Sequence, residues 1–327
     1  MTTITGRSEM DAEPSGDFAE AGASRRGDRV FKGFSIGSGA FVVVLIAAIA
    51  FFLIAQAVPS LRANSANFFT DRVWNVDANP IQFGIPDLLW VTVSSSIVAM
   101  VLSIPVAVAV ALFLTEYAPK RLARPFAALV DTLAAVPSIV YGLWGAYIVL
   151  QYLSDIQNGI SKVLGWIPIF STDSIIPASI FAGGVVLAIM ILPIVTAISR
   201  EVFTQTPTAH KEAALALGAT RWEMIRTAVL PFGRPGVISA SMLGLGRALG
   251  ETIAVLLIIN EVRGDWSWSI FTGGNTIAAR IARDSGEFNS GQKTGAYIAA
   301  GLVLFILTFA VNAAARVVIE RRKAFTE

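Results

Sequence analysis

Two charged residues inside an apolar run are the strongest candidates for chemistry in this sequence. Arg247 and Glu251 lie in LGLGRALGETIAVLLIIN, residues 243–260. In a helix, their four-residue spacing would place both side chains on one face, about 6 Å apart along the axis. Near the centre of a bilayer each charge costs about 2.5–3.5 kcal/mol on insertion scales, so neither is expected to face lipid without compensation. The pair is therefore either a structural ion pair or a site for an anion, because a planar guanidinium can hold an oxyanion through two parallel hydrogen bonds.

In the second of these interpretations, Arg247 attracts the anion and Glu251 is its resting counter-ion. Two hydroxyl side chains could add neutral hydrogen bonds to the same path, Ser138 and Thr252. Serine and threonine in membrane helices commonly bond to their own backbone, which is the alternative for both. Asp131 is expected to be a solvated charge at the membrane surface.

The composition excludes several other kinds of site. The chain has no cysteine and a single histidine, His210, so disulfides, thiolate nucleophiles and His clusters for a metal are excluded. Hydrophobic residues make up 54% of the sequence and charged residues only 15%. The hydrophobic fraction is higher and the charged fraction is lower than in a typical soluble domain. The sequence therefore predicts an all-α integral membrane protein and no nucleic-acid partner.

The elements that must position these residues are apolar runs long enough to cross a bilayer. A helix needs roughly 20 apolar residues to span the hydrocarbon core. Six runs meet that length, residues 37–58, 89–114, 126–152, 178–198, 236–260 and 295–317. Prolines interrupt some of them, and Gly246 and Gly250 form a G-x-x-x-G pair that would let another helix approach closely. Such features suit transport, but they also suit packing alone.

The basic residues predict how the six runs are oriented. With the N-terminus inside, 17 lysines and arginines lie in cytoplasmic segments and 7 in outer loops. Both termini should therefore be cytoplasmic. We expect a disordered tail at residues 1–36, a membrane domain at 37–317 and a short cytoplasmic tail at 318–327.

The inner loop at residues 199–234 predicts a helix, a glycine hinge and a second helix. Thr206 followed by Pro207 fits the start of the first helix, and Gly218 fits a left-handed cap that ends it. A capping box, TRWE at 220–223, opens the second helix, which is expected to stop before Pro231.

The first of these short helices presents small side chains, Ala213 and Ala214, together with Leu217. A surface of this kind suits insertion into a groove of a partner protein. The alternative is an amphipathic helix that rests on lipid headgroups.

The same loop resembles a known sequence motif. EAALALG at 212–218, with LP at 230–231, is similar to the EAA loop of ABC-importer permeases. Ala228 departs from the family pattern, in which isoleucine is usual. The resemblance implies that this loop is the coupling helix that docks into an ATP-binding subunit, and it maps that role to Glu212, Ala213, Ala214 and Gly218.

Three further stretches extend the resemblance over residues 37–317. LTEYAP at 114–119, VPSIVYGLWG at 136–145 and LGLGRALGETIAV at 243–255 resemble the permeases of the phosphate-specific transport family. LPFGRPGV at 230–237, leading into MLGLGRALGETIAV at 242–255, resembles the C-type more than the A-type subunit. The family implies import of inorganic phosphate across the bacterial cytoplasmic membrane. It implies four kinds of partner: an A-type permease in a heterodimer, two ATPase subunits, an extracytoplasmic phosphate-binding protein and membrane lipid.

The sequence contains no G-x-x-x-x-G-K-[ST] motif for binding nucleotide. On the family interpretation, ATP is bound by a separate chain, and this polypeptide is a permease without a cofactor or enzymatic activity of its own. Importers of another oxyanion, molybdate or sulfate, are the first alternative. A gradient-driven secondary transporter would also place charges at midplane, although it would not need the EAA loop.

Overall fold

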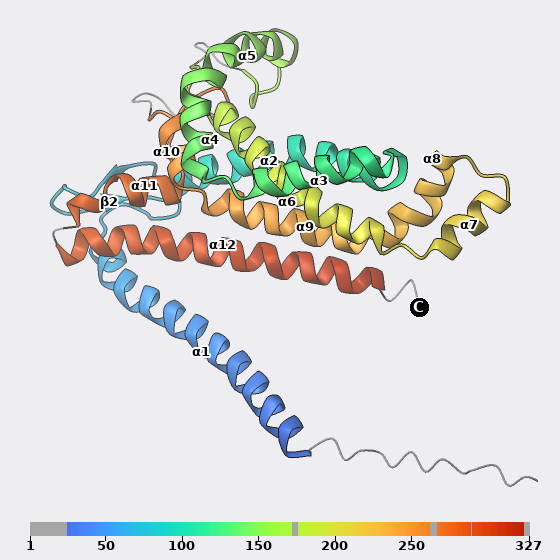
Figure 1. Cartoon of the computed structure of the whole chain (residues 1–327). Helices are drawn as coiled ribbons and strands as arrows, with labels where there is room; N and C mark the ends of the chain where they lie inside the picture. Colours follow the sequence, from blue (N-terminus) through green and yellow to red (C-terminus); the bar gives the residue numbers. More distant parts are fainter. Residues whose placement is uncertain (1–24, 172–175, 262–266, 289, 324–327) are drawn as a thin grey trace, which may run out of the picture. The chain divides into compact units, whose positions relative to one another are not determined.

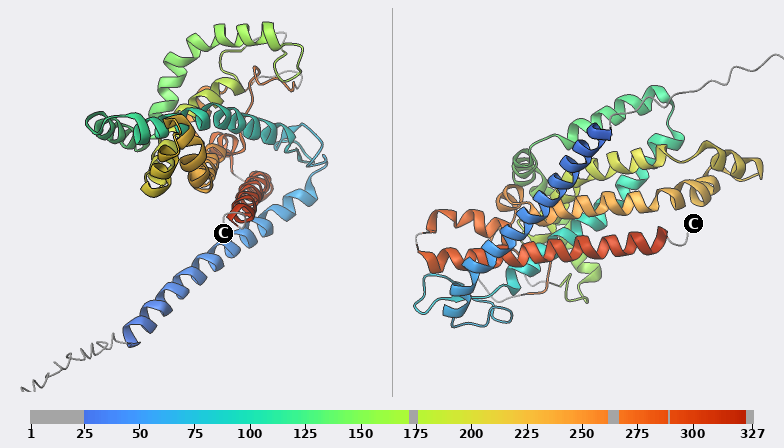
Figure 2. Two further views of the ribbon diagram at one scale, coloured as in Figure 1. Left: turned by 90° about the vertical axis from the view of Figure 1, so that its right-hand side faces the viewer. Right: turned by 90° about the horizontal axis from the view of Figure 1, so that it is seen from below.

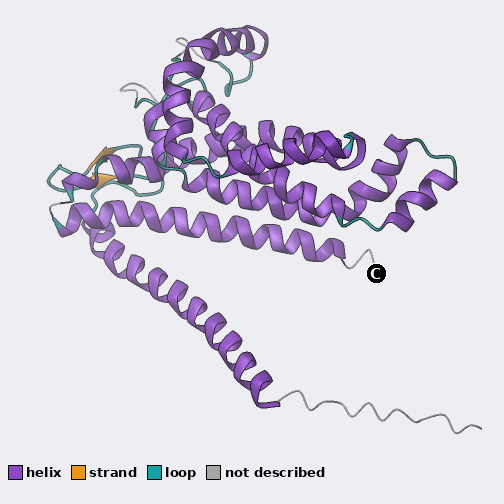
Figure 3. Ribbon diagram, in the orientation of Figure 1, coloured by secondary structure: helices purple, strands orange, loops and turns teal. Residues whose placement is uncertain are grey.

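The computed structural model describes residues 25–171, 176–261, 267–288 and 290–323. Helices dominate this part of the chain (Figure 3), and six of them are long and apolar enough to cross a membrane, which confirms the predicted all-α membrane fold. The chain divides into two units, residues 1–52 and 53–327. Residues 1–24 of the predicted tail lie outside the described residues. Helix α1 begins at Arg25, earlier than the predicted boundary.

The described elements follow one another along the chain: α1 (Arg25–Ala63), β1 (Trp74–Asn75), β2 (Gln82–Phe83), α2 (Pro86–Leu112), the π-helical turn η1 (Phe113–Tyr117), α3 (Lys120–Ala134), α4 (Ser138–Trp144), the π-helical turn η2 (Gly145–Val149), α5 (Leu150–Leu164), α6 (Ile180–Thr204), α7 (Thr208–Ala216), α8 (Arg221–Met224), the π-helical turn η3 (Ile225–Val229), α9 (Leu230–Gly250), α10 (Ile253–Ile258), α11 (Ile277–Arg283), the 3-10 turn η4 (Ser285–Glu287) and α12 (Gly291–Lys323). β1 and β2 form an antiparallel hairpin in which Trp74 pairs with Phe83.

Four of the six predicted spans match these helices, and the third differs. The prediction placed one helix over 126–152, but α3 ends at Ala134 and α4 starts at Ser138. Pro137 explains the break, because a proline disfavours helical geometry in the residue before it and its own φ of -59° with ψ of 140° is extended. The continuous helix of membrane length in this region runs over Ser138–Leu164.

The fifth predicted span, 236–260, also differs. The helix starts earlier, at Arg221, and ends at Gly250, so α10 is a separate short helix. Pro231 does not end α8 as predicted. The π-helical turn η3 precedes this proline, and its wider turn lets the chain continue into α9 without a break.

Glycines set how closely the central helices of the second unit pack. A Cβ atom at Gly184 would lie 3.0 Å from the carbonyl oxygen of Ser95, so α6 and α2 meet nearly backbone to backbone. On α9, the close contacts with α6 are made at Gly233, Gly236 and Gly244. The predicted G-x-x-x-G pair does not serve this purpose, because no neighbouring atom lies within 4 Å of a Cβ built at position 246 or 250. The face of α9 that packs against α6 therefore carries Gly233, Gly236 and Gly244, and not the predicted pair.

The second unit has two distinct ends. α7 and α8 lie at one end together with the C-terminal end of α12, whereas the β-hairpin and α11 lie at the other (Figures 1 and 2). At the hairpin end, α12 packs closely on the last turns of α1, where the Ser60 hydroxyl donates a hydrogen bond to the carbonyl of Gln292 over 2.9 Å. The long helices connect the two ends, so each end can carry a different task.

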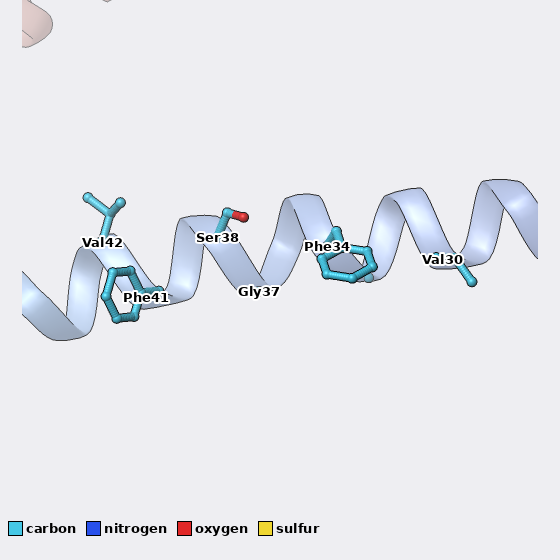
Figure 4. A pocket seen from close by; sticks show the side chains of 7 residues that line it. Val30, Phe34, Gly37, Ser38, Phe41 and Val42 are labelled. Atoms are coloured by element: carbon cyan, nitrogen blue, oxygen red, sulfur yellow. The ribbon is translucent and has the colours of Figure 1, made fainter.

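The first unit is described by the N-terminal part of α1. A shallow apolar hollow lies on this helix (Figure 4) and is lined by Val30, Gly33, Phe34, Gly37, Ser38, Phe41 and Val42. All of these residues come from a single helix, and most of their side chains are apolar. The hollow is a feature of one helix surface, and it offers no converging polar groups for a substrate.

Candidate functional site

Arg247 and Glu251 lie on either side of a helix break. Arg247 is in the last turn of α9, whereas Glu251 has an extended backbone, with φ of -68° and ψ of 127°. Thr252 follows, and α10 begins at Ile253. The prediction that both charges share one face of a continuous helix is therefore wrong. The apolar run continues through this point, so hydropathy alone gave no sign of the break.

Side chains at the break replace the lost helical hydrogen bonds. Oε1 of Glu251 accepts a hydrogen bond from the backbone N–H of Ala254 over 3.3 Å, and thereby caps the start of α10. The Thr252 hydroxyl donates to the carbonyl of Gly250 over 3.2 Å. Short polar side chains that bond to nearby backbone compete with helix formation in this way. Glu251 therefore has a local structural task that the sequence did not reveal.

The two charges are not compensated by each other. In the described part of the chain, neither Arg247 nor Glu251 has an ion-pair partner within 4.0 Å. Arg247 instead lies where the carbonyls that end α9 carry partial negative charge, which favours a cation. Glu251 lies where the first N–H groups of α10 favour an anion. Both side chains are partly buried.

The second helix break, at Pro137, packs against this region. A Cβ atom at Gly142 of α4 would lie 2.8 Å from the Cα atom of Ala254, so α4 and α10 are in close backbone contact. The Tyr141 hydroxyl donates to the carbonyl of Leu133 over 2.9 Å and so bridges the Pro137 break. The two interrupted segments are thus in contact through α4 and α10.

The predicted hydroxyl residues occupy different positions relative to Arg247. Ser138 is the first residue of α4 and is partly buried, and Thr252 is in the break itself. Among the described residues, no hydrogen bond joins either hydroxyl to Arg247. Space around Arg247 is left by Gly246 and Gly250, since a Cβ atom at either glycine would have no neighbour within 4 Å. The site can therefore offer guanidinium N–H groups that are not used by a protein carboxylate.

The loop between α6 and α9 has the predicted helix–hinge–helix form. Gly218 has φ of 86°, the left-handed geometry that the prediction required. The capping box is also confirmed: the Thr220 N–H donates to Oε2 of Glu223 over 2.7 Å, and the Glu223 N–H donates to the Thr220 hydroxyl over 3.3 Å. The predicted start is wrong, because α7 begins at Thr208 and Thr206 is buried, with no hydrogen-bond partner for its hydroxyl in the described residues.

The four residues mapped to coupling do not share one exposed surface. Glu212, Ala213 and Gly218 are exposed, and the neighbouring Leu217 is 89% exposed. Ala214 instead packs inward, against a cluster formed by Ala111, Leu112, Phe203, Met224, Ile225 and Val229. The exposed part of the loop can meet a partner, whereas Ala214 fixes the loop to the helix bundle.

Two ion pairs near this end were missed by the sequence reasoning. Nζ of Lys211 lies 2.6 Å from Oε1 of Glu116, in the turn η1 that follows α2. Arg200 pairs with Asp131 over 3.2 Å, so Asp131 is not simply the solvated charge that was predicted. The first pair joins residues 95 positions apart in the chain. A single sequence carries no local signal for a contact of this kind.

The opposite end of the second unit holds a third group of charges. Arg280 lies 2.8 Å from Glu261 and 2.6 Å from Asp284, and the Tyr297 hydroxyl donates to Asp284 over 2.8 Å. Burial acts to lower the pKa of Arg280, but the carboxylates of Glu261 and Asp284 outweigh it and raise the pKa. This network keeps α11 attached to α12 and to the chain that follows α10.

Comparison with known proteins assigns the chain to a family. Residues 103–324 match the family described as "Binding-protein-dependent transport system inner membrane component". The chain belongs to this family. The matched range contains both the break at 251–252 and the loop with α7 and α8, so both candidate regions lie in the part that family members share.

Relatives in this permease family are similar in sequence to this chain over most of its length. "Phosphate transport system permease protein PstC 2" of Mycobacterium tuberculosis is 54% identical over 299 residues, which cover 90% of this chain and 92% of that protein. "Phosphate transport system permease protein PstC" of Mycobacterium leprae is 53% identical, with 90% and 94% covered. The protein of the same name from Xylella fastidiosa is 38% identical, with 90% and 91% covered.

Two solved structures share the fold of this permease. The MetNI methionine ABC transporter in an inward-facing form matches with a TM-score of 0.52 at 16% identity, over 72% of this chain and 94% of that chain. A bacterial ABC transporter involved in the import of the acidic polysaccharide alginate matches with a TM-score of 0.52 at 17% identity, over 90% and 99%. The two matches show a common permease fold.

Proposed function

We propose that this chain is a permease subunit of an ATP-driven importer and that its cargo is inorganic phosphate. The observation that carries the proposal is the identity of 54% with a relative named as a phosphate transport permease, because it extends over 90% of the chain. An agreement of that length includes both the helix break beside Arg247 and the loop with α7 and α8. The chemistry of both regions suits the proposal.

Arg247 is the residue proposed to contact phosphate. Its guanidinium is partly buried and has no ion-pair partner within 4.0 Å among the described residues, and open space lies beside Gly246 and Gly250. A guanidinium can hold a tetrahedral oxyanion through two parallel hydrogen bonds, whereas a lysine cannot reproduce that geometry. Glu251, Ser138 and Thr252 complete the proposed path. Glu251 would act as counter-ion only by giving up part of its role as the cap of α10.

The exposed face of the loop is proposed to meet the ATPase. Glu212, Ala213 and Gly218 are the exposed members of the set, and Leu217 beside them is almost fully exposed. A helix with small side chains can enter a groove on a partner. ATP is expected to be bound by that partner, and two such subunits would serve a pair of permeases.

The remaining partners are proposed from the position of the other surfaces. A second, A-type permease would face the open side of α9 at Gly246 and Gly250 and enclose the space beside Arg247. An extracytoplasmic phosphate-binding protein would dock at the end that carries α11 and the β-hairpin. The excess of lysine and arginine in the inner segments supports cytoplasmic termini in a bacterial cytoplasmic membrane. The C-terminal end of α12 shares its end of the unit with α7 and α8, in agreement with that orientation.

Import of another oxyanion is the second candidate, because the guanidinium of Arg247 would bind sulfate or molybdate with the same geometry. Copurification of the chain with its ATPase, followed by an assay of anion-dependent ATP hydrolysis in the presence of the binding protein, tests the proposal. We expect hydrolysis to be stimulated by phosphate and not by sulfate or molybdate. Stimulation by one of the other two anions alone would reassign the cargo, and failure to bind any ATPase would contradict the importer.

A further inference from the structure

The Lys211–Glu116 ion pair connects the short helix α7 to the end of the second span. The distance between Nζ and Oε1 is 2.6 Å, and only 20% of the lysine side chain and 7% of the glutamate side chain are exposed. The other ion pair near this end, Arg200–Asp131, has an aspartate that is 51% exposed. Exposed pairs contribute little, because water and salt screen them. A largely buried carboxylate depends much more strongly on its partner.

The helix that this pair holds has few other attachments. No residue of α7 is fully buried. Ala214 packs against the nearby core cluster, but its methyl group is small. At the far end, the Ala219 N–H donates to the carbonyl of Ala214 over 3.2 Å, which closes the hinge within the loop itself. The position of α7 relative to the bundle therefore depends on Lys211 to an unusual degree.

π-helical turns at the ends of long helices contribute to both attachment points of α7. Glu116 belongs to η1, which ends the helix that begins with α2, and the cluster under Ala214 includes Ile225 and Val229 of η3, which leads into α9. Turns of this type are found frequently at functional sites, and each adds a residue to the turn.

We propose that Lys211 and Glu116 form a latch that transmits the movement of α7 to α2, a role that rests on the proposed function of the loop in coupling. Lys211 and Glu116 are positioning residues: they do not touch phosphate or ATP. When the ATPase moves α7, the latch makes α2 follow, while the Ala214 contact makes η3 and α9 follow. Without the latch, α7 can still bind the ATPase, but its movement reaches the bundle only through the small apolar contact of Ala214.

The test uses the full chain assembled with its ATPase and A-type permease in proteoliposomes. Lys211→Met removes the ammonium, and Glu116→Gln removes the carboxylate charge with little change in size. The exchanged pair, Lys211→Glu with Glu116→Lys, restores opposite charges. Asp131→Asn is the matched control, because it neutralises the exposed ion pair near the same end.

The decisive readout is the amount of phosphate imported per ATP hydrolysed. We expect each single variant to bind the ATPase normally but to import roughly tenfold less phosphate per ATP. The factor reflects the free energy that a hydrogen bond to a charged group contributes. Asp131→Asn should match the parent, and the exchanged pair should recover. Unchanged coupling in both single variants would overturn the latch, as would a loss that the exchanged pair does not recover at all.

Hydrogen exchange of the α7 amides in the purified chain gives a second readout that needs no substrate. These amides should exchange roughly tenfold faster in each single variant, because local opening is then less costly. Equal exchange in parent and variants would contradict the latch. If exchange responds as expected but the parent complex imports no phosphate, the proposed function fails while the attachment of α7 stands.

Discussion

The hinge at Gly218 can be tested by substitutions that differ in how they tolerate its backbone. Gly218 has φ of 86°, and a Cβ atom placed there would have no neighbour within 4 Å. A side chain at this position therefore meets no steric obstacle, and any cost comes from the backbone. For an L-residue the left-handed region costs about 1–2 kcal/mol, whereas asparagine visits it readily. Gly218→Val should thus disturb the hinge, and Gly218→Asn should be tolerated.

The free-energy cost of the left-handed backbone lowers the population of loops that have the geometry required for docking. A cost of about 1–2 kcal/mol lowers the ratio of native to alternative hinge geometries by roughly 5- to 30-fold, so that from equal populations the native fraction falls by roughly 3- to 15-fold. The apparent affinity for the ATPase falls in proportion to the native fraction, because binding must first restore the hinge. The bundle should keep its stability, since Gly218 is exposed and lies outside the packed core.

The assay is binding of the purified ATPase to each variant in detergent, with thermal unfolding measured alongside. Gly159→Ala is the control, because this glycine of α5 also has open space at its Cβ position but a right-handed helical backbone. Weaker binding by the valine variant, with normal binding by the asparagine variant and the control, is the expected result. Equal loss in the valine and asparagine variants would refute the argument from backbone geometry.

Three further experiments test separate parts of the structure. Gly142→Ala should destabilise the chain by about 1–3 kcal/mol in thermal unfolding, because its methyl group would lie 2.8 Å from the Cα atom of Ala254; an unchanged melting temperature would contradict the close contact of α4 and α10. Thr220→Ala should cost about 1 kcal/mol and speed amide exchange in α8, whereas Thr220→Ser keeps the cap; equal exchange in both would exclude the capping box as the source of protection. Because the chain has no cysteine, Leu217→Cys should be shielded from an impermeant thiol reagent in intact cells and Ser285→Cys should react, and the reverse pattern would invert the proposed orientation.

Local features of the structure could be predicted because they depend on neighbouring residues. The left-handed geometry of Gly218 and the capping box at Thr220 and Glu223 involve residues within a few positions of one another. The apolar runs predicted the existence of six spans for the same reason, since the hydrophobic thickness of a bilayer acts on each run separately.

Features that depend on distant contacts or on competing hydrogen bonds could not be predicted. The break after Gly250 arises because Glu251 and Thr252 bond to backbone groups at the break, although the run around them stays apolar. The ion pair of Lys211 joins residues 95 positions apart. The neighbouring helix α6 also determines which glycines of α9 make close contacts. Gly244 contacts Val195 of α6, whereas the predicted pair, Gly246 and Gly250, faces open space.

Three matters stay predictions: the orientation of the two termini, the identity of the partners, and the roles of Arg247, Glu251, Ser138 and Thr252. The structure changes how the charged pair is interpreted, however. Each charge is stabilised by a separate helix end and not by the other charge. Neutralising one of them therefore leaves the stabilisation of the other in place. Glu251→Gln keeps a side-chain oxygen that can cap α10, so it should fold normally.

The central claim is that an ATP-driven complex imports phosphate and that Arg247 contacts the anion. The most direct measurement is the initial rate of ATP-dependent uptake of radiolabelled phosphate into proteoliposomes that contain the assembled complex, with the parent chain, with Arg247→Gln, and with Arg247→Gln combined with Glu251→Gln. We predict rapid uptake by the parent and at least a tenfold lower rate for both variants, despite normal assembly, because a neutral amide lacks the charge-assisted hydrogen bonds of the guanidinium. Parental uptake by the double variant would contradict the claim and would make the two charges structural.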